Sequence, residues 1–261
     1  MTPQHIELVK ATVPVLREHG VALTSYFYQR MLNNNPELKN TFNLDHQSSG
    51  RQPRALAAAV LAYAENIENP SVLAKALERI TSKHVSLDIQ PEQYMIVGEN
   101  LLHSISEVLD VPMDSDLIAA WKAAYTQLAE LMIGMEQNKY QALTTQVGGW
   151  AGWRDFNITA IEHTEQHSLI SVVAADAQAV LAAEIGEALS VRVAVPQQDL
   201  RQPQQFKLTA ITDSGYQFAV VANQQASEFC VANILIQHYQ VGDTIELSAP
   251  LSSIDVTAQG A

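Results

Sequence analysis

The residue in this sequence best suited to holding a metal is His84. It lies in helical register with Leu73, Leu77 and Ile80, so a stripe of apolar side chains ends in a single imidazole. An axial ligand to haem iron would be presented in this way. A lone histidine on an apolar helix face is also commonly a buried structural residue. The choice between these interpretations depends on the residues around it.

A haem ligated by His84 would need polar groups on its opposite side, able to hydrogen-bond an iron-bound diatomic molecule inside an otherwise apolar pocket. Tyr28 and Gln52 are the candidates for these polar groups, and Phe42 and Leu56 for apolar contacts. Each polar candidate has an ordinary alternative. Tyr28 would serve equally as a core aromatic, and Gln52 as a polar residue at a helix start.

On the side of His84, an acceptor for its second ring nitrogen would make the imidazole more basic. Glu136 is the candidate, because it is an acid beside the apolar stripe of the last predicted helix. Tyr94 lies on the apolar face of the helix that Pro91 is predicted to open. The alternatives are a solvated helix carboxylate for Glu136 and a core aromatic for Tyr94.

The predicted elements around these residues change type once along the chain. Helices are predicted from Thr2-Pro3 onward and at 21–33, 52–68, 71–84, 91–109 and 115–141. Their inward faces are predicted to include Val108, and in the last helix Leu117, Trp121, Ala124, Leu128, Leu131 and Met135. Alternating strands are predicted at 156–161, 169–173, 191–195, 206–211, 217–221 and 244–247, with a loop or short helix at 180–188.

This change predicts two domains, 1–145 and 146–261, with the boundary at about 142–153 and Gly148-Gly149 as the hinge. The first domain is predicted to be all helical. The short, regularly spaced strands of the second suit an antiparallel barrel or sandwich rather than a parallel sheet.

Composition narrows the classes of partner and the location. A formal charge of −13 argues against nucleic acid or an anionic membrane surface as the main partner. No apolar run reaches membrane-spanning length, and the N-terminus lacks the pattern of a signal peptide, so a cytoplasmic location is expected. The single cysteine, Cys230, cannot form an internal disulfide and is expected to be a small buried apolar residue.

Three segments of the first domain carry a family resemblance: KATVPVLREHGVALTSYFYQRMLNNNPELKNTFN, ITSKH and PEQYMIVGENLL. They resemble the globin domain of bacterial flavohaemoglobins, which are nitric oxide dioxygenases. The resemblance implies haem b, and it implies these positions: His84 as proximal ligand, Tyr28, Gln52 and Leu56 as the distal residues, Phe42 as the aromatic beside the haem, and Tyr94 and Glu136 as the proximal hydrogen-bonding pair. One departure is Pro53, where the family has a polar or charged residue. It fits the first turn of a helix but could shift where Gln52 points.

Two later segments, GGWAGWRDFNI and VGDTIELSAP, resemble the linker, first strand and a late strand of the FAD-binding barrel of the same family. The implied architecture is a globin fold followed by an antiparallel β-barrel of the ferredoxin-reductase FAD-domain type. The family holds flavin with an Arg-x-Tyr-Ser segment. One register places Arg201-Gln202-Pro203-Gln204 there, and another places Gln204-Gln205-Phe206-Lys207. Neither reproduces the motif.

Other parts of the flavin site also differ from the family. Its Pro-Gly-Gln-Tyr turn corresponds to Ile185-Gly186-Glu187-Ala188, and its Gly-x-x-Ser phosphate loop falls near 228–232, without glycine or serine. From residue 146 onward, four basic residues stand against twelve acids, a formal charge of −8. A diphosphate would therefore meet an acidic field with few cationic partners. We expect that the barrel does not bind FAD tightly.

The resemblance also implies a following nicotinamide-binding domain, yet no Gly-rich strand-to-helix fingerprint occurs in the sequence, so an NAD(P)H site is expected to be absent. Erosion of the flavin motif favours a natural end at Ala261. The expected function is binding of O2 and NO, with nitric oxide dioxygenation supported by a separate reductase. The alternatives are a haem-based gas sensor or carrier whose barrel is an interaction module, and peroxidase-like chemistry.

Overall fold

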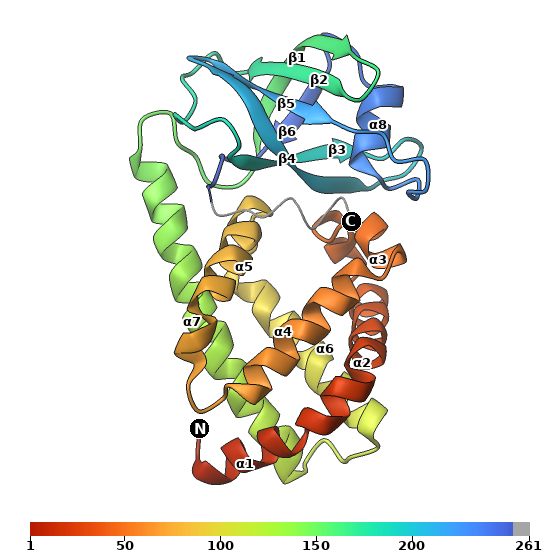
Figure 1. The fold of residues 1–261 in the computed structure, drawn as a ribbon, viewed down its shortest axis with the longest axis vertical. Helices are drawn as coiled ribbons and strands as arrows, with labels where there is room; N and C mark the ends of the chain where they lie inside the picture. The colour runs from red at the N-terminus through yellow and green to blue at the C-terminus, as the bar shows by residue number, and fades with distance from the viewer. Residues whose placement is uncertain (253–261) are drawn as a thin grey trace. The chain divides into compact units, whose positions relative to one another are not determined.

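The structure, a computed structural model, describes residues 1–252 (Figure 1). Its helical elements are α1 (Pro3–Ala11), α2 (Val13–Asn34), η1 (Pro36–Asn40), α3 (Leu44–Ser48), α4 (Arg51–Glu65), η2 (Pro70–Leu73), α5 (Ala74–Ser86), α6 (Pro91–Leu109), α7 (Asp116–Thr145) and α8 (Val231–His238). The elements η1 and η2 are short 3-10 helices. The predicted run of helices before residue 145 is therefore confirmed.

Helix starts follow the capping chemistry of the sequence. The Thr2 hydroxyl accepts the His5 N–H at 3.1 Å, and Pro3 occupies the first turn of α1. The α6 helix begins with a reciprocal cap between Gln90 and Gln93, with Pro91 at the first position. Both helices therefore start where the sequence supplies a side chain that accepts an unpaired backbone N–H, followed by a proline, which has no N–H to pair.

The second predicted helix was too short at its beginning. It was expected from residue 21, but α2 starts at Val13. Pro14 occupies its first turn, where a missing N–H costs nothing. Gly20 does not break the helix. A Cβ atom at this position would make an ordinary van der Waals contact, 3.5 Å from the Cβ of Ala57, so an alanine would also fit between α2 and α4 here.

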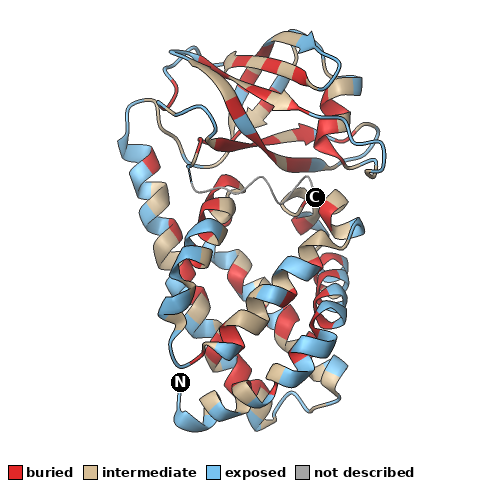
Figure 2. Ribbon diagram, viewed as in Figure 1, coloured by how far each residue is buried: buried red, intermediate tan, exposed pale blue. Residues whose placement is uncertain are grey.

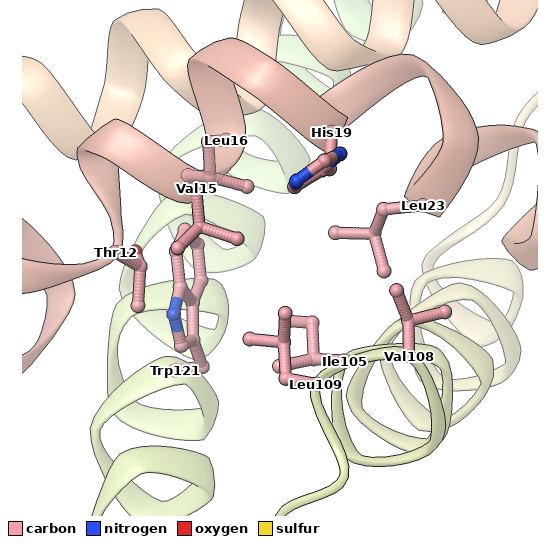
Figure 3. A pocket seen from close by; sticks show the side chains of 9 residues that line it. All are labelled: Thr12, Val15, Leu16, His19, Leu23, Ile105, Val108, Leu109 and Trp121. Atoms are coloured by element: carbon pink, nitrogen blue, oxygen red, sulfur yellow. The ribbon is translucent and has the colours of Figure 1, made fainter.

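In the helical part, α2 packs most extensively against α4 and α6. A small apolar hollow lies among α2, α6 and α7, with His19 among its apolar side chains (Figure 3). Trp121, which lines it, is buried as predicted, but Val108 and Leu131 were predicted inward and are 37% and 46% exposed. On a straight helix, positions spaced by three and four do not stay on one line but turn slowly around the axis. Over the 30 residues of α7, part of such a row therefore turns away from the neighbouring helix, which leaves Leu131 exposed.

The later part folds as a closed antiparallel barrel (Figure 1). Its strands are β1 (Arg154–His163), β2 (Ser168–Ala174), β3 (Ala188–Ala194), β4 (Arg201–Thr212), β5 (Gly215–Val220) and β6 (Thr244–Leu247), in the spatial order β1-β2-β5-β4-β3-β6. Burial alternates strictly along β2, as expected for a strand with one face in the core (Figure 2). Helix α8 packs on β3 and β4.

The turn between β4 and β5 requires glycine. A Cβ atom on Gly215 would lie 1.9 Å from the carbonyl oxygen of Val172, on the strand that pairs with β5. Helix α8 was not predicted, because a short apolar run such as VANILI has no period that separates helix from strand. Residues 180–187 form no helix.

The chain groups into two compact units that do not follow a single cut in the sequence. One contains Met1–Leu38, His46–Leu77 and Gln90–Met135. The other joins Lys39–Asp45, Glu78–Ile89 and the chain from Glu136 onward, which includes the barrel. We call these the helical unit and the barrel unit. The boundary at 145/146 marks where helix gives way to strand and stays a prediction for independent domains.

Over residues 1–252, no helix is both long enough and apolar enough to cross a membrane.

Candidate functional site

The predicted ligand His84 is paired with the predicted Glu136 within the barrel unit. Nδ1 of His84 lies 2.8 Å from Oε1 of Glu136. The Glu136 side chain is only 3% exposed, whereas that of His84 is 31% exposed. A carboxylate so buried needs a partner, which excludes a solvated helix residue. With Nδ1 bonded to a carboxylate, a metal bound by His84 would be held through Nε2.

Helix α7 contacts the His84 segment a second time through Tyr140, one turn after Glu136. The Tyr140 hydroxyl donates to the carbonyl of Ile89 at 2.9 Å, and the Ile89 N–H donates to the carbonyl of His84 at 3.0 Å. Burial raises the pKa of Tyr140, and the charges of Asp88 and Glu136 raise it further, so the hydroxyl stays a donor. Sequence reasoning missed Tyr140, although its i, i+4 spacing from Glu136 places both on one helix face.

The distal candidates Tyr28 and Gln52 meet within the helical unit. Tyr28 comes from α2 and is 7% exposed, and Gln52 lies in the first turn of α4. Burial raises the pKa of Tyr28 well above its ordinary value, and a hydrogen bond with Gln52 offsets only part of this. The phenol therefore remains protonated and can donate its O–H to a bound molecule.

Gln52 is held in place by two features. Gln47 of α3 donates Nε2–H to its Oε1 at 2.9 Å, which leaves the amide nitrogen of Gln52 to donate to Tyr28. Sequence reasoning missed Gln47. Pro53 does fit the first turn of α4, and its carbonyl accepts the Thr24 hydroxyl at 2.7 Å. Gln52 keeps its bond to Tyr28 despite the proline.

The remaining candidates are placed as follows. Leu56 lies half-buried one turn after Gln52, and Phe42 belongs to the segment of the barrel unit that follows η1. Tyr94 is buried in α6, and its carbonyl accepts the Tyr125 hydroxyl at 2.6 Å. The structure thus pairs His84 with Glu136 and Tyr28 with Gln52, each within its own unit. The roles of Leu56, Phe42 and Tyr94 stay predictions.

The side chains at the flavin-motif position of the barrel bond to the chain itself. The Arg201 guanidinium bonds to Glu246 at 2.5 Å, and Arg192 bonds to the same carboxylate at 2.7 and 2.9 Å. Burial raises the pKa of Glu246, but hydrogen bonds and charge from the two arginines outweigh it and leave the pKa below its ordinary value. Phe206, the aromatic ring of the alternative register, faces the core with its centroid 5.4 Å from that of Phe218.

Gln202 is fully buried and bonds to the 39–45 segment. Its Oε1 accepts the Leu44 N–H at 2.7 Å, and its Nε2 donates to the carbonyl of Lys39 at 2.7 Å. The carbonyl of Pro203 accepts the side-chain amide of Asn43 at 2.7 Å. The polar groups of this stretch therefore have partners within the barrel unit.

The residue before the 228–232 stretch, where the resemblance implies a phosphate loop, bonds to an acid. The Ser227 N–H and hydroxyl donate to Oδ1 of Asp45 at 2.7 and 2.8 Å. Cys230 then caps α8 through its backbone and is buried, as expected. A carboxylate beside this loop repels a diphosphate.

Clusters of three or more His, Cys, Asp or Glu side chains able to hold a metal ion by themselves do not occur within residues 1–252. A metal held by His84 thus requires a group that supplies the other ligands, and haem does so through its four ring nitrogens. His84, whose ring is held by Glu136 through Nδ1, fits this group as the residue that would bind the iron.

Residues 25–132 match the globin family model. The bacterial globin of Campylobacter jejuni superimposes on the chain with a TM-score of 0.51 at 39% identity, covering 54% of this chain and 99% of that one. The flavohemoglobin of Malassezia yamatoensis, solved with bound FAD and haem, gives a TM-score of 0.85 at 25% identity over 98% of this chain and 65% of its own. The fold is thus a globin followed by a barrel of the FAD-domain type, and the chain is a haem protein.

The relatives narrow this class. The chain is 46% identical to a flavohemoprotein of Chromobacterium violaceum over 255 residues, which is 96% of this chain and 63% of the relative. It is 44% identical to a flavohemoprotein of Bordetella pertussis over 264 residues, or 99% of this chain and 65% of the relative. The chain belongs to the flavohaemoglobin family and spans somewhat less than two-thirds of the length of these relatives.

Proposed function

We propose that this chain binds O2 and NO at haem b and converts NO to nitrate as a nitric oxide dioxygenase. The observation that carries the proposal is the 2.8 Å contact between Nδ1 of His84 and Oε1 of the buried Glu136. A carboxylate bonded to the ring makes a ligating histidine a stronger electron donor, which favours reaction at the iron over simple storage of oxygen. The relationship to flavohemoproteins supports the same reading.

Each residue has a role in this proposal. His84 would hold the iron, and Glu136, bonded to its Nδ1, fixes the ring and would increase its electron donation to the metal. When bound, haem supplies an iron that takes a diatomic ligand and exchanges one electron. Tyr28 keeps its proton on the phenol oxygen and presents it as a donor, held by Gln52. Phe42 and Leu56 would supply apolar contacts, and Tyr94 would complete the proximal hydrogen bonds.

We also propose that the barrel does not hold FAD tightly and that electrons come from a separate reductase. The polar groups of Gln202 and Pro203 are engaged by the 39–45 segment, and Phe206 faces the core. Asp45 bonds to Ser227, directly before the 228–232 stretch to which the resemblance assigns the phosphate loop, and so brings a carboxylate close to it. These contacts support the proposal because a flavin would have to displace them.

Absorption spectra test the cofactor proposal. The purified protein should show a Soret band, and protein saturated with FAD and then desalted should retain no flavin bands. Retention of stoichiometric flavin would overturn the FAD proposal and would leave the haem proposal standing.

Product analysis tests the reaction. The oxygenated protein should convert added NO to nitrate once per haem when alone, and repeatedly when a flavin reductase and NADH are supplied. Failure to turn over with any donor would exclude a dioxygenase. A gas sensor or carrier, the alternative supported by the altered flavin face, predicts instead a ligand-dependent change in hydrogen exchange of the barrel strands.

A further inference from the structure

The barrel unit contains more than the barrel. The segments 39–45, 78–89 and the end of α7 from Glu136 belong to it, and they carry Phe42 and His84. The predicted proximal ligand, its carboxylate partner and the predicted haem aromatic are therefore grouped with the strands. The hydrogen bonds between the strands and these segments therefore determine where Phe42 and His84 lie.

A chain of hydrogen bonds runs from the barrel to the peptide bond of His84. Nε2 of Gln205 in β4 donates to the Ser190 hydroxyl of β3 at 2.9 Å. The Ser190 hydroxyl donates to that of Ser86 in the last turn of α5, also at 2.9 Å. The Ser86 hydroxyl then donates to the carbonyl of Lys83 at 2.8 Å. This carbonyl belongs to the peptide bond that joins Lys83 to His84.

The members of this chain are deeply buried. Ser190 is 0%, Ser86 1% and Gln205 4% exposed, so none of them can exchange its partner for bulk water at little cost. A buried polar group left without a partner costs about 1–3 kcal/mol. Each of the two hydroxyls accepts one bond and donates one, and this holds only while α5 keeps its position on β3. These hydrogen bonds therefore fix the position of the last turn of α5 on β3, in addition to stabilising the contact between them.

A second set of bonds holds the segment that carries Phe42. Gln202, 0% exposed, engages the Leu44 N–H and the Lys39 carbonyl, each at 2.7 Å. Asn43 donates to the carbonyl of Pro203 at 2.7 Å. The two attachments to β4 lie on either side of Phe42 in the sequence, so the backbone at this residue is fixed from both directions.

We propose that the part of the barrel formed by Ser190 of β3 and by Gln202 and Gln205 of β4, at the flavin-motif position, is a positioning device for the haem ligand. Ser190 and Gln205 set the last turn of α5 and thereby the orientation of His84, and Gln202 sets the segment around Phe42. These are positioning residues, since they act through the backbone. The inference rests on the proposed ligation of iron by His84, and it gives the barrel a function that needs no flavin.

The serine relay is tested with Ser190→Ala and Ser86→Ala, each of which breaks the chain at a different bond. The control is Ser171→Ala in β2, whose hydroxyl accepts a bond from Nε2 of Gln217 at 3.1 Å but touches no part of the His84 segment. The readouts are the iron–histidine stretching band of the ferrous protein by resonance Raman and hydrogen exchange of residues 83–89 in the protein with and without haem.

We expect both relay variants to lower and broaden the iron–histidine band and to speed exchange at 83–89 about tenfold, while Ser171→Ala changes neither. The double variant should be no worse than the single ones, because one chain is being broken twice. An unchanged band and unchanged exchange in both relay variants would refute the inference, as would an equal change in the control. His84→Ala separates the two proposals, since an iron–histidine band that survives it refutes His84 ligation, while exchange in haem-free protein still tests the relay.

The second attachment is tested with Gln202→Met, using Gln217→Met as the control. Protection of the Leu44 amide against exchange should fall about tenfold in the first variant and remain in the second. If Leu44 keeps its protection in Gln202→Met, the claim that Gln202 positions the Phe42 segment is wrong.

Discussion

The candidate haem residues and the flavin-motif residues of the barrel differ in what their hydrogen bonds join. Glu136 bonds Nδ1 of His84, the ring nitrogen that does not hold the metal in the proposed ligation, and Tyr28 stays protonated beside Gln52. In the barrel, the polar groups of Gln202 and Gln205 are engaged by other parts of the chain. The first set of contacts is compatible with the proposed ligand, and the second joins strands and segments of the same chain to each other.

This contrast shows that a fold and its ligand site are separable. The barrel closes because apolar residues alternate along its strands, with Phe156, Ile170 and Phe218 fully buried in its core. None of these residues belongs to the flavin motif. The strands could therefore keep their arrangement while the side chains at the motif changed, and function has to be argued from the site.

The most direct test of this comparison is a substitution at His84. Replacing it with alanine removes the only proposed protein ligand of the iron, so haem should be lost on desalting or should lose its iron–histidine signature. The measurement is the Soret band per mole of protein. Arg201→Ala, at the flavin motif, is the matched control and should leave haem content unchanged. Full haem retention with an unaltered spectrum in His84→Ala would show that another residue ligates the iron.

On the distal side, Tyr28→Phe keeps the ring and removes the donor. Loss of a buried hydrogen bond to a polarised ligand should raise the rate of O2 dissociation about 10- to 100-fold. Flash photolysis or stopped-flow mixing measures this rate. A rate within twofold of the unaltered protein would mean that Tyr28 is a core aromatic, the alternative that its sequence position allowed.

The same tyrosine predicts an alkaline transition. The pKa of Tyr28 is raised in the folded protein, so its contribution to stability is complete below the unfolded value near 10 and is lost as the pH rises above it. Thermal melts between pH 8 and 11 should show a smaller alkaline loss for Tyr28→Phe than for the unaltered protein. An identical pH dependence would contradict the assigned burial effect.

In the barrel, the carboxylate shared by two arginines should matter at low pH. Glu246→Gln removes the charge that Arg192 and Arg201 bind, at a cost of about 1–3 kcal/mol in the free energy of unfolding. Because the pKa of Glu246 is lowered by folding, its contribution is present above the unfolded value near 4.3 and is lost as the pH falls through the folded value. Denaturant unfolding at pH 7 and pH 3 measures the difference, which should shrink at pH 3.

The smallest effect is expected for Arg201→Ala. Its side chain is 55% exposed, so the pair with Glu246 is screened by solvent and should contribute at most about 1 kcal/mol. A loss as large as that of Glu246→Gln would mean that Arg201, and not Arg192, carries the interaction.

The sequence alone determined features that depend on neighbours along the chain. Apolar spacing predicted α4 to α7, alternation predicted the six barrel strands, and the apolar stripe ending at His84 singled out this residue as the candidate proximal ligand. The resemblance to flavohaemoglobins added the proposed roles of Tyr28 and Gln52. Spacing patterns involve residues close together in the sequence, and the family resemblance is carried by continuous segments, so both can be recognised without the structure.

Only the tertiary structure decided which distant groups meet. The sequence named Glu136 as an acceptor for His84, and the structure joins the two by a hydrogen bond across 52 residues of chain. Ser86 and Ser190 are 104 residues apart and are joined by a hydrogen bond that no sequence pattern indicated. Periodicity says which face of a helix is buried but not which strand covers it, so the relay to Lys83 and the attachment of Gln202 to the 39–45 segment were beyond the reach of the sequence. Hydrogen bonds of this kind arise from packing, which brings residues together only after the elements have formed.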